Sequence, residues 1–341
     1  MPIPALPLAG RSGTRPQALP FALPLMLAAA FAVPAVAQEP PAAFPSRPVT
    51  LVVPAQPGAS FDVTARLYSQ KLGESLRQPV VLEHRPGAGG TIAYASVAKA
   101  PANGYTMMLV TPTFVLTGLL YKDLPWDVQK SFAPISHTSS APYVFYVHPE
   151  LPVRNLQEYA AYAKARPGAL NMGTSGAGSI NHVGGEWLHS LIGSRATFVH
   201  YKTSPLLLTD MLSGRIQGSI SSIVFVKPHI AAGKFKPIGL TARVRTPVLP
   251  DLPTLHEQGA TGYDLVSWFG FVAPGATPAP LVNRLSAEFA RAVKSPDVLE
   301  TLKGDGALPV GSTPEQFAQL LAADVGRWKK IIQERNIVLE E

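Results

Sequence analysis

The sequence predicts an α/β protein made of two α/β units between which the chain crosses twice. Over most of its 341 residues, apolar runs of strand length alternate with segments of helical periodicity, as in parallel sheets covered by helices. The alternation is interrupted at 132–147 and at 263–274, where β-rich pieces follow one another without a helix. The length suits two domains of ordinary size. Two units that share two crossings are expected to form a hinged pair.

The first 37 residues have the features of an export signal. Arg11 and Arg15 supply positive charge, no acidic residue precedes Glu39, and an apolar run covers 19–31. The run leads to Ala35-Val36-Ala37, a small-x-small cleavage pattern. A membrane anchor is the alternative, but the run is short and is broken by prolines. We expect a signal peptide at 1–37, cleavage before Gln38, and a soluble, exported mature protein.

Composition excludes several classes of function. The chain has no cysteine, so disulfides, thiol catalysis and cysteine-based metal sites are ruled out. There are 29 Lys and Arg residues against 22 Asp and Glu, and two of the basic residues lie in the signal, which leaves a net charge of +5. The basic residues are scattered and are not interleaved with aromatic ones, so nucleic acid is not an expected partner. Histidines and carboxylates show no metal-ligand spacing, and we expect neither a metal nor a cofactor.

In the first unit, strands are predicted at 48–54, 79–83 and 106–110. The turn at 57–60 leads into a helix whose first turn contains Asp62, and the side chain of Asp62 either favours the helix dipole or contacts a ligand. The turn at 84–91 is rich in glycine. It is neither a dinucleotide fingerprint, since Ile92 stands where the third glycine belongs, nor a P-loop.

The second unit is predicted to span about 146–258. Asn155 with Glu158 marks the start of its first helix. Strands are expected at 170–172, 196–200, 218–220 and 237–240, and helices at 180–191, 206–212 and 223–232. Strand pieces at 264–266 and 269–272 lead back to two final helices, which are marked by Thr277-Pro278 and by a capping box over 313–316. We expect these helices to cover the sheet of the first unit. The first lobe would then comprise 43–145 plus 259–341, and the second lobe 146–258.

The stretch at 170–180 carries the clearest functional signal. A short apolar run ends in the Gly, Ser and Thr residues of 173–179, and a helical pattern begins at Ile180. Such a strand-to-helix turn offers backbone N–H groups, hydroxyls and the positive end of a helix dipole, which together suit a carboxylate. An ordinary βα turn has the same composition, so both readings remain open on these residues alone.

An enzyme is the alternative reading of the same stretch. Residues 173–177 resemble the nucleophile elbow of a serine hydrolase, with Ser175 as the nucleophile. His182, His200 or His229 would have to supply the base, and no motif surrounds any of them. We therefore expect a protein that is not an enzyme.

Motifs spread in order over about 45–340 resemble those of one protein family. They lie at 47–54 with Pro57-Gly58 and Asp62, and at 83–90, 102–106, 200–202, 249–254 and 267–270. This pattern is similar to the tripartite tricarboxylate transporter substrate-binding proteins, also called the Bug family of periplasmic solute receptors. The resemblance implies a type II periplasmic-binding-protein fold, in which two α/β lobes close on a small organic acid. It further implies that the receptor is a monomer and delivers the organic acid to membrane permease subunits. A sensory receptor that presents its ligand to a signalling partner would have the same fold.

The resemblance also implies a set of binding residues. In the family, such residues bind the carboxylate mainly through backbone amides, hydroxyls and waters. Carried over onto this sequence, they are Pro57, Gly58, Ala59, Ser60, Asp62, Gly89, Gly90, Thr111, Thr174, Ser175, Gly176, Gly178, Ser179, Tyr201, Lys202 and Ser221. Three positions depart from the family pattern: Ala59, Thr203 and the pair Ser221-Ser222. The last departure removes an acidic group that could bind an ammonium, which favours a plain carboxylate over an amino acid as the ligand.

Overall fold

A computed structural model describes residues 44–57, 60–201, 204–304 and 306–338. The predicted signal peptide at 1–37 lies outside the described residues, as do Gly58, Ala59 and Lys202. The strands are β1 (Val49–Val53), β2 (Val80–His84), β3 (Thr106–Val110), β4 (Phe132–Val147), β5 (Asn171–Thr174), β6 (Thr197–His200), β7 (Gly218–Ser222), β8 (Lys236–Leu240), β9 (Val266–Pro274) and β10 (Leu308–Pro309). The helices are α1 (Ser60–Leu76), the 3₁₀ turn η1 (Ala88–Gly90), α2 (Thr91–Ala98), α3 (Pro112–Leu120), α4 (Leu156–Ala165), α5 (Ile180–Leu191), α6 (Ser204–Leu212), α7 (Ile223–Ala231), α8 (Ala279–Val293), α9 (Pro296–Gly304) and α10 (Pro314–Arg335).

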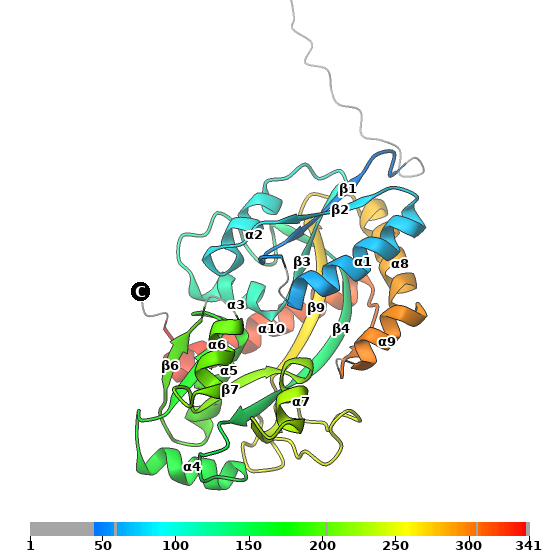
Figure 1. The fold of residues 1–341 in the computed structure, drawn as a ribbon. Coiled ribbons are helices and arrows are strands. Elements are labelled where there is room, and N and C mark those ends of the chain that lie inside the picture. Colours follow the sequence, from blue (N-terminus) through cyan, green and yellow to red (C-terminus); the bar gives the residue numbers. More distant parts are fainter. Residues whose placement is uncertain (1–43, 58–59, 202–203, 305, 339–341) are drawn as a thin grey trace, which may run out of the picture. The chain divides into compact units, whose positions relative to one another are not determined.

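The described strands form one sheet in the order β2-β1-β3-β9-β4-β7-β5-β6, and β8 and β10 pair with β4. β1, β2 and β3 run parallel at one end of this order, and β5, β6 and β7 run parallel at the other end. The long strands β4 and β9 are antiparallel to each other and lie side by side between these two groups (Figure 1). The chain therefore forms two parallel α/β groups that are joined through β4 and β9.

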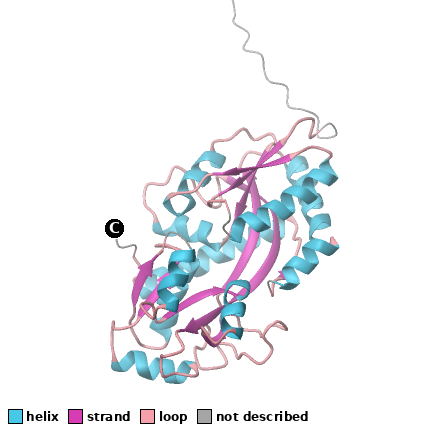
Figure 2. Ribbon diagram, viewed as in Figure 1, coloured by secondary structure: helices cyan, strands magenta, loops and turns pink. Residues whose placement is uncertain are grey.

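β1 and β3 are mostly apolar on both faces because helices cover both faces of the sheet there (Figure 2). In β1, Leu51 and Val53 belong to a core that includes residues of α1, α8 and α9, whereas Val52 belongs to a core on the opposite face. That opposite core continues through α2, α3, α5 and α10. In β4, Tyr146 packs in a third core with residues of α6 and α7. Successive side chains thus alternate between faces, as the pleat requires.

The last helix, α10, contacts elements of both groups. It packs on β4, α3 and α5, and the ring centroids of Trp328 and Trp187 lie 6.0 Å apart. α8 packs on β4 and α1, as expected for a helix that covers the first group. The division into lobes at 145/146 and 258/259 stays a prediction. Its first boundary falls within β4, which pairs with β9 up to Pro142 and with β7 from Tyr143 onward.

β4 differs most from its sequence-based expectation. The sequence suggested two separate pieces because polar residues occupy 136–140, but the structure has one strand with two bulges. Ser136 and Thr138 of this segment are buried, and both side chains are hydrogen-bonded. The Ser136 hydroxyl donates to the Ser312 carbonyl at 2.8 Å, and the Thr138 hydroxyl donates to the Phe269 carbonyl at 3.1 Å. Buried polar groups with partners are compatible with a strand, and their composition alone did not show this.

Other corrections concern shorter elements. The two strand pieces expected at 264–272 form the single strand β9, and α3, α9 and β10 were not anticipated. Thr277 does not cap α8, because the N-cap is Pro278 and the Thr277 hydroxyl donates to the Pro274 carbonyl. The caps predicted at Asn155 and Thr313 are confirmed. Among the described residues, no helix combines the length and the apolar character needed to cross a membrane.

Candidate binding site

The predicted binding residues gather where parallel strands end. In one group Val53 of β1 pairs with His84 of β2, and β3 ends next to Thr111. In the other group Thr174 of β5 pairs with His200 of β6, and β7 ends at Ser222. The carboxyl ends of parallel strands lie at one edge of their sheet, and the loops that follow them bind ligands in open α/β folds. Each group therefore carries its predicted residues at its carboxyl edge.

The β5–α5 loop, residues 175–179, is organised around a buried amide. Asn181 in the first turn of α5 accepts three hydrogen bonds at Oδ1, from Ser175 N at 3.3 Å, Ser175 Oγ at 3.1 Å and Ser179 Oγ at 2.6 Å. Its Nδ2 donates to the Ile220 carbonyl of β7 at 3.3 Å. Asn181 was not among the predicted residues. Its position just inside a helix that follows a serine-rich turn was the signal that could have found it.

The backbone before α5 adopts glycine-specific conformations, and the first turn of α5 has no side-chain cap. Gly176 has φ 130° and Gly178 has φ 73°, values that side-chain-bearing residues rarely adopt. Ser179 is the N-cap, yet its side chain makes no capping hydrogen bond, and its hydroxyl lies 2.6 Å from both the Gly176 carbonyl and Asn181 Oδ1. The first N–H groups of a helix have no partner within the helix. This loop therefore leaves them to an acceptor other than the N-cap side chain.

Two histidines lie against this loop. His200 Nδ1 is 2.6 Å from the Thr174 hydroxyl, and the rings of His200 and His182 pack edge to face with centroids 4.7 Å apart. His182 Nδ1 accepts from the Gly178 N–H at 3.1 Å. Burial, with a smaller contribution from His200, lowers the pKa of His182 to about 4. His182 is therefore neutral at pH 7 and helps to fix the backbone of Gly178.

The remaining predicted residues of this group have partners of their own. The Tyr201 N–H donates to the Thr174 carbonyl at 3.0 Å, and its hydroxyl donates to Asp210 at 2.7 Å. Burial, followed by that hydrogen bond, raises the pKa of Tyr201 to about 12. The Ser221 hydroxyl is 3.2 Å from the Tyr146 hydroxyl. The structure thus brings Tyr201 beside Thr174 and places Ser221 next to Ile220, the residue that Asn181 binds.

On the other group, two more helices begin at predicted residues. Thr111 is the N-cap of α3 and is buried, and its side chain makes no capping bond. Gly90 is the N-cap of α2 and also provides no side-chain cap, and Gly89 precedes it in η1. The Thr117 hydroxyl of α3 donates to the Gly89 carbonyl at 3.1 Å, which ties the glycine turn to α3. Gly89, Gly90 and Thr111 therefore lie in one connected region.

Asp62 is only 3% exposed and has partners other than those expected. Its Oδ2 accepts from Arg66 Nε at 2.9 Å, and its Oδ1 lies 2.7 Å from His84 Nε2. The carboxylate therefore joins the first turn of α1 to the end of β2. His84 lay in the glycine-rich motif but was not predicted to have a role. Pro57 is exposed in the loop before α1, while nothing is described for the Ser60 side chain.

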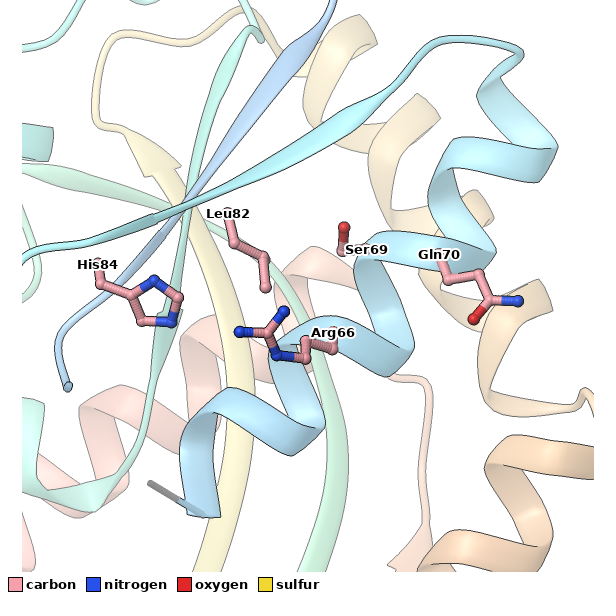
Figure 3. A pocket seen from close by; sticks show the side chains of 5 residues that line it. All are labelled: Arg66, Ser69, Gln70, Leu82 and His84. Atoms are coloured by element: carbon pink, nitrogen blue, oxygen red, sulfur yellow. The ribbon is translucent and has the colours of Figure 1, made fainter. Parts of the chain in front are cut away.

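A pocket of about 490 Å³ adjoins this cluster but not the predicted loops. It is lined by Arg66, Ser69 and Gln70 of α1 and by Leu82 and His84 of β2 (Figure 3). Arg66 and His84 point toward each other in the pocket (Figure 3). Both bind Asp62. Because β2 is an outer strand of the sheet, this pocket lies at the sheet margin and away from the β5–α5 loop.

The sequence matches that of a known protein family. Residues 64–337 match the model of the tripartite tricarboxylate transporter family receptor, TctC. The chain belongs to this family of receptors. Among the described residues, no group of three or more histidine or acidic side chains could hold a metal ion. The family consists of solute-binding receptors and not of enzymes, so the hydrolase reading of Ser175 is set aside.

Solved structures of similar proteins support the same assignment. This receptor is 34% identical to Rpa4515 of R. palustris, solved with adipate, with a TM-score of 0.80 over 86% of this chain and 99% of that one. It is 29% identical to the periplasmic binding protein BugD, with a TM-score of 0.79 over 87% and 100%. It is 32% identical to MatC of Rhodopseudomonas palustris, solved with bound malate, with a TM-score of 0.77 over 85% and 100%. The receptor therefore has the periplasmic-binding-protein fold.

Proposed function

We propose that this receptor binds a small carboxylate at the β5–α5 loop and the helix starts around it, and that it delivers the ligand to a tripartite tricarboxylate-type permease. The observation that supports this proposal is that three described helices at the strand ends, α3, α5 and α7, begin without side-chain caps. The N-caps of α3, α5 and α7 are Thr111, Ser179 and Ser222, and none of their side chains makes a capping hydrogen bond. A carboxylate would accept from such N–H groups in their place.

Two helices that begin away from the site, α4 and α10, are capped by side chains, whereas α8 begins at Pro278 without a side-chain cap. Asn155 of α4 accepts from the Glu158 N–H, and Thr313 of α10 forms a full capping box with Gln316. Where Asn and Thr precede α4 and α10, away from the predicted site, they therefore act as working caps. At the site, the serine that precedes α5 turns its side chain to other partners. This contrast supports a binding role for the uncapped helix starts.

The proposed site comprises the predicted residues together with the backbone that follows them. Thr174, Ser175, Gly176, Gly178 and Ser179 would shape the β5–α5 loop around one carboxylate group, with Tyr201, Lys202 and Ser221 beside it. Residues 57–60, Gly89, Gly90 and Thr111 would meet the ligand from the other α/β group when the two groups close about β4 and β9. Asp62 would act through His84 and Arg66 by fixing α1 and not by touching the ligand.

The ligand class is supported by proteins of similar sequence and fold. Rpa4515 is solved with adipate and MatC with malate, and both ligands carry two carboxylates. A net charge of +5 for the chain without its signal favours an anion over a cation. The signal-like sequence at 1–37 and the likeness to BugD, a periplasmic binding protein, support location in the periplasm. We further propose that the receptor works as a monomer.

A thermal-shift panel tests this function. The purified protein without its signal is heated with mono-, di- and tricarboxylates, aromatic acids and amino acids, with the diamides of the same diacids as uncharged controls. A ligand present at one hundred times its Kd stabilises the folded state by about 2.7 kcal/mol. We expect at least one plain carboxylate to raise the Tm while its diamide does not. If no carboxylate shifts the Tm, the proposed function is wrong.

A further inference from the structure

We propose that Asn181 is the positioning residue of the site, and that its neutral amide holds the β5–α5 loop in shape while keeping the loop free of negative charge. The inference rests on the proposed carboxylate-binding function. Asn181 is 8% exposed, and its side chain joins the loop, α5 and β7 through four hydrogen bonds. The loop itself is too rich in glycine and serine to hold one conformation by packing.

The orientation of the amide follows from the chemistry of its partners. The backbone N–H of Ser175 can only donate, so the atom facing it must be the oxygen Oδ1. The carbonyl of Ile220 can only accept, so the atom facing it must be the nitrogen Nδ2. Both neighbours therefore require the same orientation. An amide satisfies these two requirements together, whereas an ionised carboxylate would place an oxygen against the Ile220 carbonyl.

This arrangement determines what the loop offers a ligand. Each serine hydroxyl has one proton, and both hydroxyls have carbonyl-type oxygens of the loop within hydrogen-bonding distance. The protons of Ser175 and Ser179 therefore point inward. A carboxylate arriving from outside meets backbone N–H groups at the start of α5, and the hydroxyls serve mainly to shape the loop.

The second half of the inference concerns the charge of the Asn181 side chain, which is neutral. Three donors converge on Oδ1, and such a cluster would also stabilise an ionised aspartate. An aspartate would place a full negative charge two residues from the N-cap, where the ligand's carboxylate is proposed to bind. Two unit charges about 5 Å apart repel strongly in a partly buried setting. Asparagine gives the same shape without this repulsion, so it determines that the site accepts an anion.

The test is to compare Asn181→Asp with wild type by calorimetric titration of adipate and malate between pH 8 and pH 5. If neither binds to wild type, the carboxylate that gives the largest thermal shift replaces them. At pH 8 we expect the variant to bind at least about tenfold more weakly. The difference should shrink toward pH 5, because the bound anion and the facing Ile220 carbonyl raise the pKa of the introduced carboxyl group and outweigh the lowering effect of the three donors. Once neutral, this group can donate to the Ile220 carbonyl. His182 and His200, the neighbouring titratable groups, are present in both proteins and affect both profiles.

Asn171→Asp provides the matched control. Asn171 begins β5, three residues before Thr174 and thus about 10 Å from it along the strand. Its side chain donates to the Arg215 carbonyl, so the substitution makes the same chemical change at the opposite end of the same strand. We expect Asn171→Asp to bind within about twofold of wild type, since the added charge is distant and screened.

Asn181→Ala tests the positioning role without added charge and serves if Asn181→Asp does not fold. We expect binding about fivefold weaker than that of wild type at every pH, because the three donors of the loop lose their shared acceptor. Asn181→Asp binding within twofold of wild type, or a deficit that does not change with pH, would overturn the role of charge. Asn181→Ala binding as tightly as wild type, or more tightly, would overturn the positioning role. A wild-type protein that binds no carboxylate would instead refute the proposed function.

Discussion

Asp62 Oδ1 lies 2.7 Å from His84 Nε2, and this contact joins the first turn of α1 to the last residue of β2. The other carboxylate oxygen of Asp62 receives Arg66 Nε from the next turn of α1. The side chain of Asp62 is therefore buried with a partner on each oxygen, and it fixes the start of the helix that follows the 57–60 loop. Sequence reasoning left Asp62 between a capping role and ligand contact, whereas the structure shows a link between two elements.

Asp62→Asn should lower the free energy of unfolding by about 2 kcal/mol, because the substitution removes the charge from two hydrogen bonds that are largely shielded from water. Urea unfolding at pH 7 measures the change. Asp297→Asn is the comparison, since Asp297 forms an exposed ion pair with Lys71 at 2.7 Å and also lies at the start of a helix. We expect that variant to be close to wild type. Equal losses of unfolding free energy in the two variants would show that the buried Asp62 contacts stabilise the fold no more than the Asp297 ion pair does.

Ser175→Ala should change carboxylate affinity by less than about threefold, because the Ser175 hydroxyl donates to Asn181 and not outward. Titration calorimetry with the best ligand of the panel measures the effect. A tenfold loss would mean that the hydroxyl turns to the ligand when the site fills, which is the role the sequence first suggested for it.

Gly176→Ala should weaken ligand binding by about tenfold, since φ 130° is strained for any residue with a Cβ and the loop would relax out of its shape. Gly168→Ala is a matched control. Gly168 has φ 75° in the turn before β5, and an added Cβ would meet no atom within 4 Å at either glycine. Both variants should lose stability to a similar extent in urea, but only Gly176→Ala should lose affinity. Loss of affinity in both would indicate a general effect of strain.

Stability should fall in acid because buried histidines must take up protons on unfolding. Burial lowers the pKa of both His182 and His189 to about 4, below the ordinary value of 6.5. Below pH 6.5 the unfolded chain binds more protons than the folded one, so this stability is present at pH 7 and is lost progressively as the pH falls toward 4. Each histidine should contribute a loss of about 2–3 kcal/mol between pH 7.5 and pH 4.5.

His189→Gln isolates one of these contributions. His189 lies between the Tyr159 hydroxyl at 3.0 Å and the Ser194 hydroxyl at 2.8 Å, and a glutamine can hydrogen-bond without titrating. Urea unfolding at the two pH values should show a smaller acid-induced loss in the variant than in wild type. An unchanged difference between the two pH values would mean that His189 does not take up a proton on unfolding.

Much of the fold could be predicted from the sequence because local signals and burial agree there. β1 and β3 are apolar throughout since both faces are covered, and Asn155 and Thr313 mark helix starts that the structure confirms. The prediction for β4 was wrong because side chains of its polar segment donate hydrogen bonds to the carbonyls of Ser312 and Phe269, which lie far away along the chain. The path of α10 across both groups depends on packing at Trp328, which periodicity does not reveal.

The candidate site divides in the same way. The β5–α5 loop was predictable because glycine and serine between a strand and a helix have a local physical meaning. The roles of Asn181 and His84 were not, since each depends on a partner brought close by folding: the Ile220 carbonyl for Asn181 and Asp62 for His84. Histidines, asparagines and aspartates are compatible with many local settings. Only the tertiary contacts show which role each of these residues has.

The measurement that tests the central claim most directly is the response of backbone amide NMR signals to a bound carboxylate. The ¹⁵N-labelled receptor is titrated with the best ligand of the thermal-shift panel and with its uncharged diamide. We predict that the amide signals at the start of α5, from Gly176 to His182, and at the start of α3 after Thr111 shift most with the carboxylate and not with the diamide. Shifts confined to the Arg66–His84 pocket, or no difference between acid and diamide, would contradict carboxylate binding at the uncapped helix starts.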